Sequence, residues 1–111
     1  MFSGLFYVEF KVADHSFGTG LVVIDNGRVN GGDQAYLYRG HFDHYSGGIR
    51  ATVEVSLYRG SPNSVLGPLR QFTLNLSGTA SDNKFELEGG SSSVPGVAIR
   101  MVGTKVAELF Q

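Results

Sequence analysis

The fold of this chain is decided by residues 49–58, which read IRATVEVSLY. Every second residue from Ile49 to Leu57 is apolar, and the residues between them are polar or charged. A period of two places successive side chains on opposite faces of an extended backbone. These residues are therefore predicted to form a half-buried β-strand.

The same alternation recurs along the chain on both sides of this segment. We expect further strands at residues 5–13, 21–24, 28–31, 34–42, 72–76, 85–87 and 97–101. Residues 45–48, 61–68 and 77–83 are predicted to be turns or loops. A last apolar stretch, residues 106–110, either closes the fold or packs as a short tail. No segment has the apolar spacing of a long amphipathic helix, so little helix is expected.

Asn26 and Gly27 mark a tight turn between the strands at 21–24 and 28–31. A type I′ turn needs positive φ at both central residues, and Asn-Gly satisfies that need well. Gly18 and Gly20 lie just before the first of these strands, where glycine is typical of a bulge or a bend.

About eight short strands joined by short turns predict an all-β, antiparallel up-and-down barrel formed by a single domain over residues 1–111. Closure into a barrel removes exposed strand edges, which favours it over the alternative, a two-sheet sandwich. An eight-stranded barrel has an interior that side chains fill or that holds one small ligand.

The composition excludes several classes of protein. The chain has 111 residues, 16 glycines and no cysteine, which rules out disulfide frameworks, zinc ribbons and thiol chemistry. Its net charge is −1 and the charges are scattered, which argues against direct nucleic-acid binding. No apolar run is long enough for a membrane span, and the first residues lack the features of a signal peptide, so a cytoplasmic location and no membrane partner are expected.

Two groups of residues are candidates for a catalytic or metal site. His41, Asp43 and His44 include ligand types for zinc or iron, but on a strand His44 points away from the other two, so a solvated strand end is the preferred interpretation. Glu86 and Glu88 share one strand face and could form a carboxylate pair for glycoside hydrolysis, but the solvent-exposed face of a strand is the simpler interpretation. We therefore expect no enzyme activity, no metal and no cofactor.

Tyrosine and arginine gather in the middle of the chain, and both are enriched at protein interfaces. The tetrapeptide at residues 37–40, LYRG, recurs at residues 57–60, either by coincidence or as a repeated feature of the barrel rim. If these side chains share an exposed face, they form a protein-binding patch. The candidate partner-binding residues are Tyr36, Tyr38, Arg39, Asp43, His44 and Tyr45.

Residues 18–33, GTGLVVIDNGRVNGGD, followed by YLYRG at 36–40, resemble the GrlR family of negative regulators of type III secretion. The residues that carry this resemblance are Gly18, Gly20, Asn26, Gly27, Gly31, Gly32, Asp33 and Gly40. The resemblance implies a calycin-like, lipocalin-shaped barrel that dimerises and binds a transcriptional activator, without catalysis and without direct DNA contact. Such regulators can present an acidic loop after the Tyr-x-Gly strand, where this chain has one carboxylate, Asp43, in residues 43–48.

The expected function is thus a homodimeric, non-catalytic negative regulator that binds a transcriptional activator. The alternative is a barrel that carries a small hydrophobic ligand in its interior. The bulk of the residues expected to point inward, such as Phe6, Phe10 and Phe72, favours a filled interior and therefore the first function.

Overall fold

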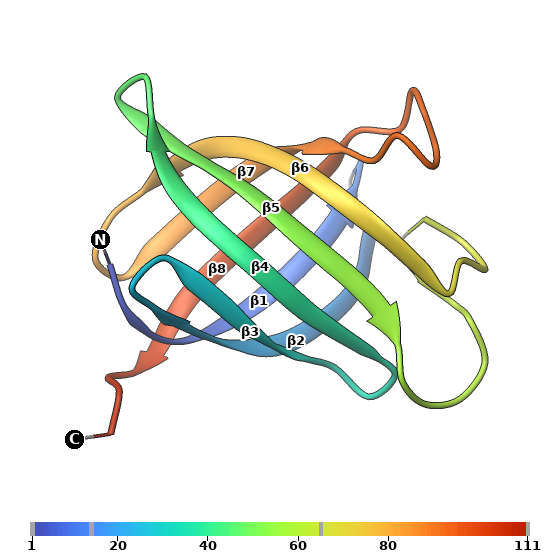
Figure 1. Cartoon of the computed structure of the whole chain (residues 1–111), viewed down its shortest axis with the longest axis horizontal. Coiled ribbons are helices and arrows are strands. Elements are labelled where there is room, and N and C mark those ends of the chain that lie inside the picture. The colour runs from blue at the N-terminus through green and yellow to red at the C-terminus, as the bar shows by residue number, and fades with distance from the viewer. Residues whose placement is uncertain (1, 14, 65, 111) are drawn as a thin grey trace.

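The computed structural model describes residues 2–13, 15–64 and 66–110, and in them eight antiparallel strands close into a barrel (Figure 1). Each strand pairs with the next along the chain, and β1 closes the barrel by pairing with β8. The predicted up-and-down barrel is confirmed, and the alternative sandwich is wrong. The strands are β1 (Gly4–Val12), β2 (His15–Asp25), β3 (Arg28–Gly32), β4 (Tyr36–Tyr45), β5 (Gly48–Leu57), β6 (Gln71–Ala80), β7 (Lys84–Gly90) and β8 (Ile99–Ala107).

The described residues contain no helix, and so none that could span a membrane. The residues that alternate along a strand point in turn into the barrel and out to solvent. On β5, Ile49, Ala51, Val53 and Val55 are buried, while Arg50 between them is exposed. Removing such side chains from water is the main favourable term in folding.

Aromatic rings fill much of the barrel interior. At the end of the barrel where β1 begins (Figure 1), the ring centroid of Phe2 lies 5.6–5.9 Å from those of Phe6, Phe42 and Phe85. The Phe85 centroid lies 5.5 Å from that of Phe6 and 5.2 Å from that of Phe42. A Cβ atom on Gly103 would lie 2.2 Å from the Phe85 ring, so the missing side chain leaves room for that ring. This packing is the arrangement that the bulky inward residues predicted.

The turns of two hairpins have the same backbone conformation. Asn26 and Gly27 have φ values of 52° and 77°, which confirms the predicted turn between β2 and β3. Ser46 and Gly47 have φ values of 48° and 82°, so the β4–β5 connection is also a turn with two positive φ angles.

The largest extensions beyond the predicted limits occur in β2, β6 and β8. β2 begins at His15, so Gly18 and Gly20 lie within it, and a register shift between Phe10 and Lys11 on β1 falls beside Gly18. β6 continues to Ala80, because residues 77–80 pair with β7; the prediction of a turn over all of residues 77–83 is therefore wrong. β8 runs to Ala107, so residues 106–107 belong to the closing strand, and residues 108–110 follow it in the described part of the chain.

Several glycines lie where neighbouring strands approach too closely for a side chain. A Cβ atom on Gly31 would lie 2.0 Å from the Leu21 carbonyl oxygen, and one on Gly40 would lie 1.9 Å from that of Thr52. Small barrels bend their strands at such glycines. Two of the glycines that carry the family resemblance are thus required by the curvature of the sheet.

Candidate functional site

The six predicted partner-binding residues divide between the inside and the outside of the barrel. Tyr36 and Tyr38 are only 3% and 2% exposed, and they point inward from β4. The register explains this, because Tyr38 lies opposite Val55, an inward residue of β5. The prediction that these two tyrosines belong to an exposed patch is therefore wrong. Arg39, Asp43, His44 and Tyr45 are exposed.

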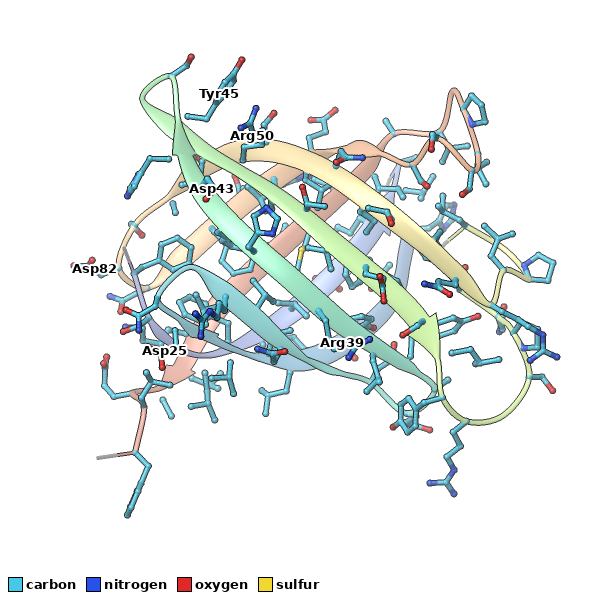
Figure 2. The ribbon with its side chains drawn as sticks, viewed as in Figure 1. Asp25, Arg39, Asp43, Tyr45, Arg50 and Asp82 are labelled. Carbon is cyan, nitrogen blue, oxygen red and sulfur yellow. The ribbon has the colours of Figure 1, made fainter. Side chains whose placement is uncertain are left out.

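Three of these exposed residues, Arg39, Asp43 and Tyr45, lie on what we call the β4–β5 outer face, which also includes His41, Arg50 and Glu54. Figure 2 shows Asp43, Tyr45 and Arg50 close to the tip of the β4–β5 hairpin. The Arg50 guanidinium carbon lies 4.5 Å from the centre of the Tyr45 ring, a cation–π contact. Farther along the strands, Arg39 Nη2 lies 3.4 Å from Glu54 Oε1.

His44 is separated from this face. It lines an open groove of about 510 Å³ at the end of the barrel, together with Phe2, Ile49, Ser81 and Asp82 among others. His41 Nε2 instead lies 3.6 Å from Asp43 Oδ2 on the outer face. Within residues 2–13, 15–64 and 66–110, no group of three potential ligands forms a metal site.

Glu86 and Glu88, the candidate carboxylate pair, lie on the outside of β7. Glu86 Oε1 is 3.4 Å from Arg100 Nη2 and 3.7 Å from Lys84 Nζ, and both Glu86 and Glu88 are exposed. The ion pairs are those of a solvated strand surface.

Asp33, in the turn between β3 and β4, organises the opposite end of the barrel from Phe2. Its Oδ1 accepts hydrogen bonds from the backbone N–H groups of Ala35 at 2.8 Å and Tyr36 at 2.7 Å. Its Oδ2 accepts one from the Tyr38 hydroxyl, and its carbonyl oxygen accepts one from the Tyr58 hydroxyl at 2.7 Å. Tyr38 and Tyr58 are the tyrosines of the two LYRG tetrapeptides, so the repeated motif brings both hydroxyls to one aspartate.

Tyr36 anchors the long loop between β5 and β6 over this end of the barrel. Its hydroxyl accepts a hydrogen bond from the Asn63 N–H at 2.9 Å and donates one to the Leu69 carbonyl at 2.7 Å. Leu66 and Leu69 also pack against the core. The inward tyrosines therefore hold loops in place.

Beneath this loop lies a cavity of about 30 Å³, whose lining includes Phe10, Asp33, Tyr38, Asn63 and Phe72. Burial raises the pKa of the Tyr38 phenol far above its ordinary value, and the hydrogen bond to Asp33 and the negative charge of that residue add to the effect. The cavity has room for about one or two water molecules.

An apolar surface that the sequence reasoning missed lies outside β1 and β2. Tyr7, Leu21 and Val23 are 46%, 45% and 39% exposed. Tyr7 lies opposite Leu21, and Leu5 lies opposite Val23, so the four side chains form neighbouring pairs on the outer face. Its signal in the sequence is the unbroken apolar run at 21–24, which lacks the polar residues of a half-buried strand.

Comparison with protein families extends the likeness seen in the first 40 residues to almost the whole chain. The model of the family described as T3SS negative regulator, GrlR, matches residues 1–109. A search of curated proteins finds no match to this chain. Because the family model matches nearly every residue, the chain belongs to the GrlR family of negative regulators of the type III secretion system.

Proposed function

We propose that this protein lowers type III secretion gene expression by binding a transcriptional activator, without catalysing a reaction, and that it does so as a homodimer. Membership of a family of negative regulators supports the regulatory role. The single structural observation that carries the mode of action is the exposed cluster at the β4–β5 hairpin tip, which we assign to the activator.

The chemistry of this tip suits protein binding. Tyr45 is 52% exposed and stacks with Arg50, while Asp43 lies opposite Arg50 in the register. Tyrosine and arginine are the residue types that most often dominate interface energetics, with tryptophan. Asp43 adds an acceptor for a basic group of the partner.

The barrel interior gives less support to the alternative function as a ligand carrier. Pockets for drug-sized ligands measure about 300–1,000 Å³. The interior cavity beside Asp33 measures about 30 Å³, and Tyr38, Phe10 and Phe72 help to fill the space around it. A lipid chain would require these side chains or the β5–β6 loop to move.

The test uses a bacterium that carries a type III secretion promoter fused to a reporter, together with the activator of that promoter. The wild-type chain should repress the reporter and should co-purify with the tagged activator. A Tyr45→Ala, Arg50→Ala variant should bind the activator at least about 30-fold more weakly, the loss typical of an interface hot spot.

The matched control is Thr73→Ala, Asn75→Ala, on the outside of β6, where both residues are exposed. This variant should repress like the wild type. Unchanged repression by the Tyr45 and Arg50 variant would reject the assignment of the hairpin tip. Binding of the purified chain to the promoter DNA itself would reject the activator as the target.

A further inference from the structure

We infer that the open groove at the Phe2 end of the barrel binds a small aromatic cation, an aryl group that carries an amidinium, a guanidinium or an ammonium. The groove lies between the β4–β5 hairpin and the β6–β7 turn and measures about 510 Å³. Small-molecule sites measure about 300–1,000 Å³. The groove therefore has the size of a ligand site, unlike the cavity of about 30 Å³ beside Asp33 at the other end.

The floor of the groove is apolar and partly aromatic. Ile49, an inward residue of β5, lines it together with Phe2, which is half-buried. The Phe2 ring is held in place by contacts with the rings of Phe6, Phe42 and Phe85. A ring that is fixed on one side and accessible on the other offers a flat surface on which an aryl group stacks.

Hydrogen-bond acceptors lie on both sides of the groove. Ser81 and Asp82 line it from the β6–β7 turn, and His44 lines it from β4. The Ser81 hydroxyl donates its proton to the Lys84 carbonyl at 3.3 Å, so its oxygen is left as an acceptor. An ionised aspartate only accepts, and a neutral imidazole has one accepting nitrogen. These groups match a ligand whose polar part carries several N–H donors.

The charge of Asp82 has no counter-charge among the described residues. No cationic side chain of that part of the chain forms an ion pair with it, whereas Glu54 and Glu86 each have an arginine at 3.4 Å. Figure 2 shows Asp82 well apart from both labelled arginines, Arg39 and Arg50. A cation bound over Phe2 would supply the missing charge, and an amidinium or guanidinium would do so through two parallel N–H bonds.

The groove shares a hairpin with the surface assigned to the activator. Gly47 and Gly48 line the groove without side chains that would close it, and Tyr45 and Arg50 lie on either side of them in the chain. A ligand that contacts this hairpin should therefore change the affinity for the activator. This coupling rests on the proposed function, whereas binding of the ligand to the groove does not.

The probe for the groove is benzamidine, which joins a phenyl ring to an amidinium. Titrated into the isotope-labelled full chain, it should shift the backbone amide NMR signals of residues 44, 47–49 and 79–82. The shifts should follow one saturable curve with a dissociation constant of about 1 mM or lower. Benzamide, which has nearly the same shape and no charge, should bind at least about 10-fold more weakly, because it cannot neutralise Asp82.

Three variants locate the bound probe. Asp82→Asn removes the charge and keeps the shape, and it should weaken benzamidine binding at least about 10-fold. Asp25→Asn is the matched control, because Asp25 is an exposed carboxylate at the same end of the barrel but outside the groove (Figure 2). It should bind like the wild type. Ala80→Trp should abolish binding by filling the groove, which the exposed Ala80 lines.

Shifts that rise without saturation, or that spread over β1 and β2, would overturn the site. Equal binding of benzamide, or an equal loss in Asp25→Asn, would also overturn it. Saturating benzamidine should change the affinity for the activator about 5-fold or more, and a change below about twofold would overturn the coupling. A chain that binds benzamidine in the groove but no activator would reject the proposed function and keep the site. A chain that binds the activator but not benzamidine would do the reverse.

Discussion

The hydroxyl of Tyr38 donates a hydrogen bond to the carboxylate of Asp33, inside the end of the barrel that the β5–β6 loop covers. The same carboxylate accepts two backbone N–H groups of the turn that leads into β4. One side chain thus fixes both the β3–β4 turn and the direction of a buried ring. Asp33 is the last residue of the GTG…GGD segment that resembles the family, and its role is structural.

Replacing Asp33 with alanine should lower the free energy of unfolding by about 2–4 kcal/mol, because two N–H groups and one phenol lose their acceptor. Tyr38→Phe should lower it by about 1–2 kcal/mol. The two losses should not add in the double variant, since both remove the same bond. Urea unfolding measures all three values. Asp82→Ala, at an exposed residue of the β6–β7 turn, is the control and should change stability by less than about 0.5 kcal/mol.

The stability of the protein should fall in alkaline solution because of Tyr38. Burial, followed by the hydrogen bond to Asp33 and its charge, raises the pKa of this phenol in the folded protein. The unfolded chain loses the proton near the ordinary value of about 10. Above that pH the folded state binds more protons than the unfolded state, so the free energy of unfolding should drop with a slope of up to about 1.4 kcal/mol per pH unit.

Urea unfolding of the wild type and of Tyr38→Phe at pH 8, 10 and 11 measures this effect. Below pH about 9 the difference between the two proteins should be constant, because Tyr38 is protonated in both states. Above that pH the difference should shrink. A difference that stays constant up to pH 11 would contradict the assignment.

Two glycines of the family-like segment should respond oppositely to alanine. A Cβ atom on Gly20 would lie 2.6 Å from the Gly32 carbonyl oxygen and 2.8 Å from Cε2 of Tyr38. Gly20→Ala should therefore lower the free energy of unfolding by about 2 kcal/mol, a loss typical of overpacking a core. On Gly18 the nearest atom would be Asp33 Oδ2 at 3.9 Å. Gly18→Ala should be neutral or stabilise by about 0.5 kcal/mol, since alanine restricts the unfolded chain. Thermal denaturation ranks the two, and equal losses would show that the strand bend itself requires both glycines.

The β4–β5 turn offers a stabilising substitution. Ser46 has a φ of 48°, a conformation that costs most residues about 1–2 kcal/mol and that asparagine tolerates better. Ser46→Asn should raise stability by about 0.5 kcal/mol by copying the Asn-Gly of the β2–β3 turn. Gly47→Ala should lower it by about 1 kcal/mol through backbone strain alone, because nothing lies within 4 Å of its added Cβ. Ser92→Asn, at an exposed loop residue whose φ is not positive, is the control.

The local alternation of apolar and polar residues was sufficient to predict the strands, because it indicates which residues share one face of a strand. The alternation of residues 49–58 gave the inward set of β5, and Asn26-Gly27 gave a hairpin with the observed turn. The same reasoning failed on β4, where large side chains occupy both faces. The predicted exposed patch includes Tyr36 and Tyr38, whereas the pairing of β4 with β5 turns both side chains into the interior.

The amino-acid sequence by itself determined the all-β class, the order of the strands and the resemblance to the family, since alternation, turn residues and motifs act within a few neighbouring positions. Only the tertiary structure decided which tyrosines are buried and where an apolar face remains uncovered. It also decided that Asp33 binds the hydroxyls of both Tyr38 and Tyr58, although Tyr58 follows Asp33 by 25 residues in the chain. These features depend on strand register and on the closure of β1 against β8. Register is set by contacts between residues distant in the chain, and a shift of one position would exchange the inside of a strand for its outside.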